Sequence, residues 1–253
     1  MCELFKPQAM EWFPEHIFSG EESIVLLILN QPLQKECEVF VKKIWKSALF
    51  HVAVDGGANV LKELFGEEIT FIPELVCGDF DSATPEVLNF YRSQGVAVIE
   101  TPDQDETDFT KALRLTEKYL KDLKLKASSV IAVARNGDRL DHILGNLNTL
   151  YSATDVISVP VLILGHNSLT WLLSIGHHKI HVSERMMDSH VGLIPLGSEC
   201  KATTTGLKWN LNNDKMKFGG LISTCNMFDG SKVVTVTTDS PLVWTMEVTM
   251  DKN

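Results

Sequence analysis

Short runs of consecutive apolar residues recur along the first two-thirds of the chain, separated by stretches with helical spacing. The apolar runs cover residues 24–29, 50–54, 75–77, 96–99, 130–133 and 161–164. Helical spacing of apolar positions marks residues 37–49, 85–95, 108–123 and 141–153. Continuous apolar strands separated by helices are typical of a parallel sheet that is covered on both faces. The pattern predicts an N-terminal α/β domain with a Rossmann-like parallel sheet.

The pattern changes after about residue 166. Residues 178–184, 191–197, 201–211, 221–228 and 232–248 are rich in β-branched side chains, often alternate, and are separated by Gly, Asn, Asp and Pro. Such short alternating segments predict an all-β domain, either a β-sandwich or a barrel-like fold. We therefore expect an α/β domain over residues 20–165 and a β-rich domain over residues 166–253.

Composition narrows the cellular setting. No run approaches eighteen apolar residues, so no membrane span is expected, and the first twenty residues lack the basic and apolar blocks of a signal peptide. The five cysteines are scattered without a CxxC pair, which is typical of free thiols in the cytoplasm. A net charge of −10 opposes binding to nucleic acid or to an anionic membrane.

Residues that suit a ligand site, most of them polar, follow the ends of four successive predicted strands. In open α/β sheets, ligands bind beyond the carboxyl ends of the strands, so these residues are expected at one edge. They are Asp55, Gly56, Gly57 and Asn59 after the second strand; Asp79 and Asp81 after the third; Asp103, Gln104, Asp105 and Asp108 after the fourth; and Arg139 and Asp141 after the fifth.

Asp79 and Asp81 are the most informative members of this set. In extended chain, residues two apart face the same way. Two unit charges about 4 Å apart repel by roughly 4 kcal/mol at an effective dielectric constant of about 20. A Mg²⁺ ion would reverse the sign of this interaction, and it prefers carboxylates together with substrate phosphates. The pair therefore predicts a magnesium site.

Ordinary structural roles are the alternative for part of the set. Asp105 or Thr107 would serve as the cap of the helix that begins near Asp108, and the glycines after Asp55 would suit a turn at a helix start. The chain lacks GxxxxGK[ST], GxGxxG, GxSxG and HExxH. P-loop, dinucleotide-binding, serine-hydrolase and zinc-peptidase classes are thus not indicated.

Several motifs, taken in order, resemble the thiamine pyrophosphokinase family of the animal type. They are VAVDGGAN, GDFDS, TPDQDETDFTKAL, RLDHILGNLNTL, TTTGLKWNL and DGSKVVTVTTDSPLVWTM, spread from about residue 24 to 249. The resemblance implies transfer of the pyrophosphoryl group of ATP to thiamine, which yields thiamine diphosphate and AMP. It also implies Mg²⁺, in-line attack at the β-phosphorus, and a homodimer in which the β domain helps to bind thiamine across the subunit interface.

The resemblance assigns roles to individual residues. Asp79, Asp81 and Asp108 would hold Mg²⁺ and form the catalytic group, in which Asp79 or Asp108 takes the proton of the thiamine hydroxyl. The nucleotide side would comprise Asp55, Gly56, Asn59, Gln104, Arg139 and Asp141. One loop departs from the family, which has a glycine-rich turn before Gly-Arg-x-Asp-His or Gln. Here the loop reads ARNGDRLDH, with a single Gly137 and with Asp138 directly before Arg139.

Thiamine carries a cationic thiazolium ring, which an aromatic face attracts by about 0.5–2 kcal/mol. The β domain offers Trp209 for this contact, and Ser223 and Asn226 as hydrogen-bonding partners of the pyrimidine. A core position for Trp209, and a turn before Asp229 for the other two, are the alternatives.

Two other functions fit part of the pattern. A Mg²⁺-dependent nucleotide hydrolase would need the same aspartates, with water in place of thiamine. A thiamine or nucleotide carrier would need binding alone, although acids at four strand ends do not favour a polyanion. AMP formation that depends on thiamine distinguishes the enzyme from both.

Overall fold

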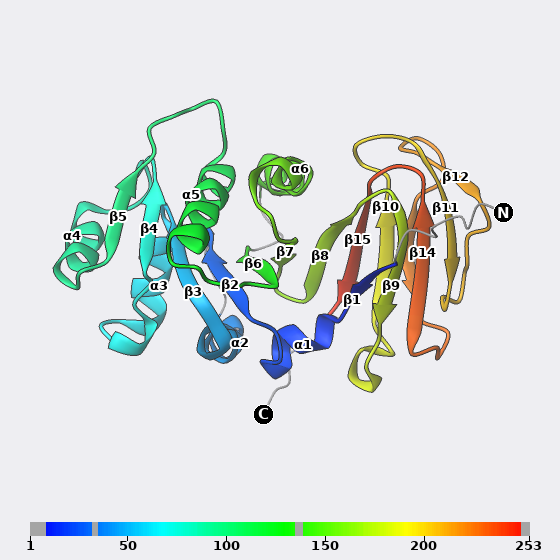
Figure 1. Cartoon of the computed structure of the whole chain (residues 1–253), viewed down its shortest axis with the longest axis horizontal. Helices are drawn as coiled ribbons and strands as arrows, with labels where there is room; N and C mark the ends of the chain where they lie inside the picture. Colours follow the sequence, from blue (N-terminus) through cyan, green and yellow to red (C-terminus); the bar gives the residue numbers. More distant parts are fainter. Residues whose placement is uncertain (1–8, 32–34, 135–138, 249–253) are drawn as a thin grey trace. The chain divides into compact units, whose positions relative to one another are not determined.

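The computed structural model describes residues 9–31, 35–134 and 139–248. The chain divides into two compact units (Figure 1). One comprises the described residues between 17 and 166, and the other combines residues 9–16 with residues 167–248. Among the described residues, no helix is both long and apolar enough to cross a membrane.

The first unit is built on a parallel sheet with the strand order β7-β6-β2-β3-β4-β5. Every described pair of neighbours in this order is parallel. The strands are β2 (Ile24–Ile28), β3 (Ala48–Val54), β4 (Leu75–Gly78), β5 (Ala97–Glu100), β6 (Ser129–Val133) and β7 (Val161–Leu164). Every residue of the central strands β2 and β6 is buried, which explains why apolar residues dominate both sequences. The α/β prediction is confirmed.

Helices cover both faces of this sheet (Figure 1). The helices of this part of the chain are α2 (Lys35–Ser47), α3 (Gly57–Phe65), α4 (Pro85–Ser93), α5 (Asp108–Asp122) and α6 (Leu140–Val156), with the short 3₁₀ helix η1 (Ile69–Phe71). Helix α1 (Pro14–Ser19) crosses the boundary between the two units. Helices α5 and α6 pack against each other on one face, whereas α2 and α3 lie against β2 and β3 on the other.

Local sequence determines where these helices begin. Thr84 caps α4 by accepting a hydrogen bond from the Val87 N–H, and Pro85 follows at the first helical position. Thr107 caps α5 by accepting from the Thr110 N–H at 3.2 Å, so the predicted cap is Thr107 rather than Asp105. Both caps lie at the carboxyl edge of the sheet, where α4 and α5 follow β4 and β5.

The second unit is a β-sandwich. One sheet has the order β1-β9-β14-β11-β12, and the other contains β13-β10-β15-β8. The bounds are β1 (Met10–Trp12), β8 (Ser168–Leu173), β9 (Gly176–His181), η2 (Glu184–Met186), β10 (His190–Ile194), β11 (Cys200–Thr205), β12 (Asp214–Met216), β13 (Ser223–Met227), β14 (Val233–Thr238) and β15 (Leu242–Glu247). Trp12 of one sheet packs on Trp171 of the other, with ring centroids 5.4 Å apart, and Trp171 in turn packs on Trp244. The sandwich, one of the two predicted forms, is confirmed.

The N-terminal strand belongs to this sandwich although it is distant in sequence. Strand β1 pairs in parallel with β9. The Trp12 indole N–H donates to Nδ1 of the buried His178 at 3.1 Å, across 166 residues of sequence. Residues 10–12, to which the sequence assigned no element, are thus part of the β unit.

Candidate active site

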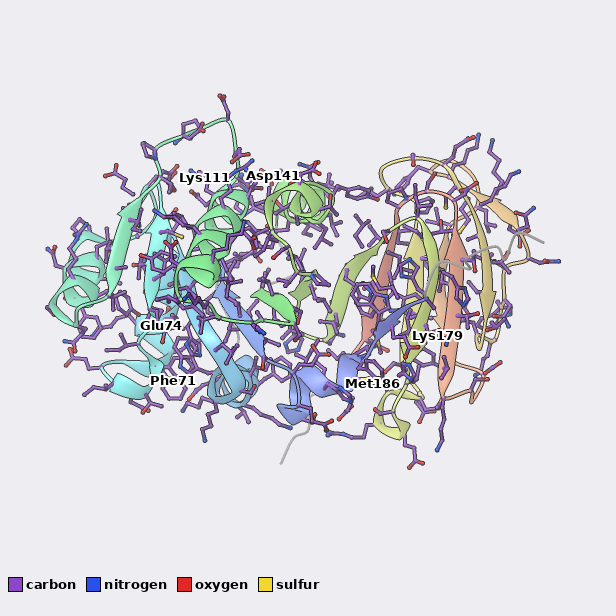
Figure 2. All side chains as sticks on the ribbon, in the orientation of Figure 1. Phe71, Glu74, Lys111, Asp141, Lys179 and Met186 are labelled. Atoms are coloured by element: carbon purple, nitrogen blue, oxygen red, sulfur yellow. The ribbon has the colours of Figure 1, made fainter. Side chains whose placement is uncertain are left out.

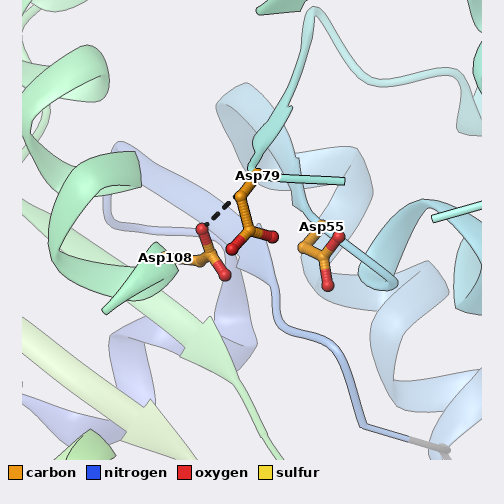
Figure 3. Close-up of side chains that lie close together, drawn as sticks. All are labelled: Asp55, Asp79 and Asp108. Carbon is orange, nitrogen blue, oxygen red and sulfur yellow. Dashed lines mark hydrogen bonds between the residues drawn. The ribbon is translucent and has the colours of Figure 1, made fainter. Parts of the chain in front are cut away.

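Three carboxylates meet at the carboxyl edge of the parallel sheet. Asp55 follows β3, Asp79 follows β4, and Asp108 is the first residue of α5. One oxygen from each lies within 4.8 Å of the others (Figure 3). The carboxyl ends of neighbouring parallel strands share one edge, so side chains far apart in sequence converge there. The spacing suits a single divalent cation with oxygen ligands.

Asp55 is held in a strained and almost fully buried position. Its φ is 49°, and its side chain has 2% exposure. One oxygen accepts from the Asn30 amide at 3.1 Å, and the other accepts from the backbone N–H groups of Ser82 and Ala83. Gly78 leaves room for this arrangement, because a Cβ there would lie 2.7 Å from the Asp55 Cβ. Asp55 therefore ties the end of β3 to the loop after β4.

Hydrogen bonds orient the other two carboxylates. Asp79 accepts from the Gln104 amide at 2.9 Å and from the Asp81 N–H at 3.2 Å, and the Gln104 bond lowers the pKa of Asp79. Asp108 accepts from the Asp79 N–H and pairs with the Lys111 ammonium at 2.8 Å. Burial raises the pKa of Asp108, and the charges of Asp79 and Asp55 add to the rise in spite of Lys111. A bound cation would relieve this crowding.

Asp81 does not join Asp79 in the way that the sequence predicted. Phe80, between them, has a φ of 62°, so the chain is not extended there and the two side chains do not share a face. Asp81 is exposed and accepts a hydrogen bond from the Ser82 hydroxyl at 2.8 Å. Among the described residues, the three carboxylates close enough to share a metal ion are Asp55, Asp79 and Asp108, so Asp55 takes the position that the resemblance implied for Asp81.

An open pocket of about 370 Å³ lies beside the cluster, entirely within the α/β unit. Asp55, Asp81, Asp108, Arg139 and Asp141 are the predicted site residues that line it. The Arg139 guanidinium donates to both oxygens of Asp141, and this pairing lowers the pKa of Asp141 to about 2. Asp141 lies at the start of α6, at the same end of the sheet as Lys111 (Figure 2).

The departure from the family pattern falls on residues 136–138, which lie outside the described residues. Arg139 and Asp141, the two members of that loop motif that the structure describes, stay together on the pocket wall.

Other residues predicted on the nucleotide side have local partners. Asn59 donates to the Ser82 carbonyl at 2.8 Å and accepts from the Thr84 N–H at 3.1 Å, so it holds the loop between β4 and α4. A Cβ on Gly56 would lie 2.1 Å from the Asn30 side chain, so the glycine allows close packing. Neither residue lines the pocket itself.

The residues predicted to bind thiamine converge in the β unit. Trp209 has 63% exposure, so it is not a core residue. Asn226, with 2% exposure, accepts from the Trp209 N–H at 3.2 Å and donates to the Trp209 carbonyl at 2.8 Å. It also donates to the Ser223 hydroxyl at 3.3 Å. Asn226 and Ser223 thus support the Trp209 segment, and the Trp209 ring projects into solvent.

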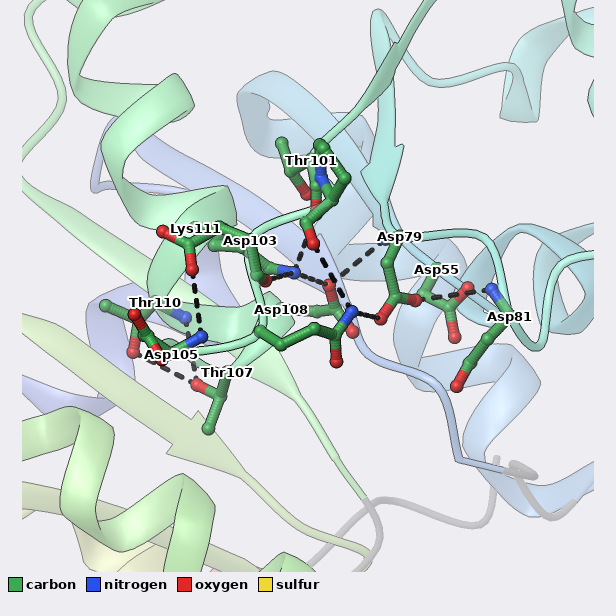
Figure 4. Close-up of polar contacts among 12 residues, drawn as sticks. Asp55, Asp79, Asp81, Thr101, Asp103, Asp105, Thr107, Asp108, Thr110 and Lys111 are labelled. Carbon is green, nitrogen blue, oxygen red and sulfur yellow. Dashed lines mark hydrogen bonds and ion pairs between the residues drawn. The ribbon is translucent and has the colours of Figure 1, made fainter.

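Two residues of the site were missed in the sequence. Asn30 follows the first predicted strand, so the rule that found the aspartates would have found it too. Lys111 lies three residues after Asp108 on a largely buried face of α5. The only feature of the sequence that could have identified it is a charged residue among apolar neighbours. Figure 4 shows its contacts with the loop before α5.

The sheet and the pocket at its carboxyl edge define the α/β class of enzymes in which the substrate lies beyond the strand ends. Comparison with known proteins gives the family. Residues 41–161 match the thiamin pyrophosphokinase catalytic domain, and residues 177–243 match the thiamin pyrophosphokinase vitamin B1 binding domain. The chain belongs to the thiamin pyrophosphokinase family, and the motif resemblance is confirmed.

Individual relatives agree with this assignment. Thiamine pyrophosphokinase 2 of Arabidopsis thaliana is 37% identical over 236 residues, covering 88% of this chain and 85% of the relative. Thiamine pyrophosphokinase 3 of Oryza sativa subsp. japonica is 37% identical over 237 residues, covering 88% and 86%. The solved thiamin pyrophosphokinase from Candida albicans superposes with a TM-score of 0.84 at 25% identity, covering 97% of this chain and 95% of that one.

Proposed function

We propose that this enzyme transfers the pyrophosphoryl group of ATP to the hydroxyethyl oxygen of thiamine. The thiamine oxygen attacks the β-phosphorus in line, the bond between the α,β-bridging oxygen and the β-phosphorus breaks, and AMP leaves. The observation that carries the proposal is the group of three carboxylates beside the pocket, within the unit that matches the catalytic domain. Asp79 or Asp108 accepts the proton of the hydroxyl group.

The donor set fits Mg²⁺. Three carboxylate oxygens within 4.8 Å, one on an almost fully buried aspartate, form a site that a hard divalent cation would neutralise. In our proposal Asp55, Asp79 and Asp108 hold the ion, and Asp81 adds a ligand from the pocket wall. When bound, Mg²⁺ would neutralise the triphosphate charge and help to orient it.

The remaining predicted residues divide between contact and support. Arg139 and Asp141 face the nucleotide from the pocket wall, whereas Gly56, Asn59 and Gln104 act by fixing the loops around it. In the β unit, the exposed ring of Trp209 stacks on thiamine, while Ser223 and Asn226 support its segment. We further propose that the active form is a cytoplasmic homodimer, as the resemblance and the scattered cysteines suggest.

One incubation tests the reaction. The protein is mixed with ATP, Mg²⁺ and thiamine, and AMP is separated from ADP. We expect AMP and thiamine diphosphate in equal amounts, formed only with thiamine present and stopped by EDTA. Nucleotide hydrolysis that does not depend on thiamine would identify a hydrolase instead. Binding of both substrates without turnover would identify a carrier.

A further inference from the structure

Lys111 is a buried cation that contacts one member of the carboxylate group formed by Asp55, Asp79 and Asp108, without lining the pocket. It lies on α5 one turn after Asp108 and has 6% exposure. Its ammonium group contacts three oxygens, each at 2.8 Å: one carboxylate oxygen of Asp108 and the backbone carbonyls of Thr101 and Asp103 (Figure 4). An ammonium group has three hydrogens, so these contacts use all of its donors.

This geometry separates Lys111 from the substrate. Lys111 does not line the pocket, and its donors have protein partners already. It therefore has no free hydrogen with which to bind a phosphate. Whatever Lys111 contributes to the site must pass through the groups that it holds.

The groups that Lys111 holds lead to two of the three carboxylates. The first is Asp108, whose Oδ1 atom receives both the Lys111 ammonium and the Asp79 N–H. The second is reached through the loop between β5 and α5, which supplies both carbonyls. The same loop carries Gln104, and the Gln104 amide donates to Asp79 at 2.9 Å. One buried cation thus fixes Asp108 directly and Asp79 through a single loop.

We propose that Lys111 is a positioning residue for the metal site, which sets the affinity for the divalent cation by fixing Asp108 and the loop that holds Asp79. The inference rests on the proposed function, because it concerns the ion that the three carboxylates would hold. A buried cation adjacent to a metal would by itself disfavour binding through charge repulsion. The positioning effect must exceed this repulsion, so removal of Lys111 should weaken metal binding rather than strengthen it.

The test compares Lys111→Met with a matched control on the same helix, Lys118→Met. Lys118 is exposed, so Lys118→Met makes the same substitution at a position outside the site. Mn²⁺ is the probe, and free Mn²⁺ is measured by electron paramagnetic resonance in the full-length protein. We expect Lys111→Met to raise the Mn²⁺ Kd at least tenfold, and Lys118→Met to leave it within twofold. In assays, the Mg²⁺ concentration for half-maximal rate should rise while the KM for thiamine stays within twofold.

A purely structural role for Lys111 makes the opposite prediction. Lys111→Met would then lower the Tm, whereas the Mn²⁺ Kd and the Mg²⁺ dependence of folded protein would not change, and the proposal would be overturned. Tighter Mn²⁺ binding in Lys111→Met would overturn it as well, since repulsion would then dominate.

A second variant covers the case in which Lys111→Met does not fold. Gln104 is exposed, so Gln104→Leu should fold normally while it removes the link from the loop to Asp79. We expect a three- to tenfold rise in its Mn²⁺ Kd, and an unchanged Kd would contradict the loop link. With both variants folded, the double variant should lose less affinity than the two single losses combined, because they share one path.

Failure of this inference is distinguishable from failure of the proposed function. Thiamine-dependent AMP formation by the wild type, with an unchanged Mn²⁺ Kd in Lys111→Met, would leave the function standing and remove the positioning role. If the wild type formed no AMP but bound Mn²⁺, and Lys111→Met lost that binding, the positioning role would stand without the proposed function. A wild type that binds no Mn²⁺ would overturn the inference.

Discussion

At the scale of single residues, the site depends on a few side chains whose positions are set by backbone geometry that the sequence does not display. Asp55 and Phe80 both have positive φ, at 49° and 62°. These two residues bring Asp55 into the carboxylate group and turn Asp81 away from Asp79. The residue scale is therefore where the metal proposal is most directly tested.

Asp81→Asn should abolish turnover if Asp81 adds a metal ligand from the pocket wall. Because Asp81 is exposed and its charge lies near other acids, the free energy of unfolding should stay the same or rise slightly. Steady-state rates at several Mg²⁺ concentrations and urea denaturation measure the two effects. Asp105 is also exposed and lies in the loop between β5 and α5, so Asp105→Asn is the matched control and should keep the wild-type rate. Near wild-type activity in Asp81→Asn would confine the ligands to Asp55, Asp79 and Asp108.

Trp209→Ala should raise the KM for thiamine several-fold and leave the KM for ATP unchanged. The loss corresponds to about 0.5–2 kcal/mol of cation–π attraction plus some contact area. Because the ring has 63% exposure, the Tm should change little. Kinetics and thermal unfolding are measured on the same preparations, and Trp209→Phe should recover most of the affinity. An unchanged KM for thiamine in folded Trp209→Ala would end the stacking proposal.

At the scale of elements, one of the contacts between β1 and β9 is a hydrogen bond to a buried histidine. His178 has 1% exposure; its Nδ1 accepts from the Trp12 indole, and its Nε2–H donates to the Ser174 carbonyl at 2.8 Å. A second proton on the ring would place a hydrogen on Nδ1, facing the Trp12 donor. Burial lowers the pKa of His178, and the neighbouring His177 adds to the shift.

Acid should therefore weaken the β unit. The unfolded chain binds this proton near pH 6.5, whereas the folded chain resists it to a lower pH. Stability is full above pH 6.5, falls as the pH drops through that value, and levels off below the pKa of the folded state. Urea denaturation at pH 7.5 and 5.5 should show a smaller loss for His178→Gln, which cannot titrate, than for the wild type. Equal losses in the two proteins would assign the pH dependence to other groups.

At the scale of the whole molecule, the α/β unit supplies the carboxylates and the pocket, and the β unit supplies the exposed Trp209. The β unit also exposes further apolar side chains, namely Phe218, Leu221 and Ile222. A contiguous exposed apolar patch is typical of a surface that another molecule covers. A second copy of the chain is the partner that the family resemblance implies.

Sedimentation at micromolar concentration should accordingly give about twice the 28.2 kDa mass of one chain. Homodimers commonly form through two-fold interfaces in which both copies use the same surface. Activity measured across a dilution series should fall as the dimer dissociates, if the β domain of one copy helps to bind thiamine at the partner. A fully active monomer would contradict the shared site.

Much of the element order follows directly from the sequence. The strands β2, β4, β6 and β7 could be located because a strand buried on both faces has a nearly continuous apolar sequence. For α3 the sequence indicated only a helix start after Asp55, as one alternative, since the helix is short and begins with a glycine, a poor helix former. Ala48 and Leu49 extended the helical spacing of α2, yet they belong to β3, because pairing with β2 outweighs local preference.

The sequence by itself determined the α/β and β classes, the gathering of acids at one sheet edge, and the family. Buried strands appear in the sequence as apolar runs, and the residues that follow a strand lie at the carboxyl edge of the sheet. The tertiary structure alone decided which three carboxylates meet, that β1 joins the sandwich, and that the buried Lys111 pairs with Asp108. Those outcomes depend on positive φ values, on a hydrogen bond across 166 residues of sequence, and on a buried ammonium with three partners. Such contacts join residues through space, and no local pattern of side chains encodes them.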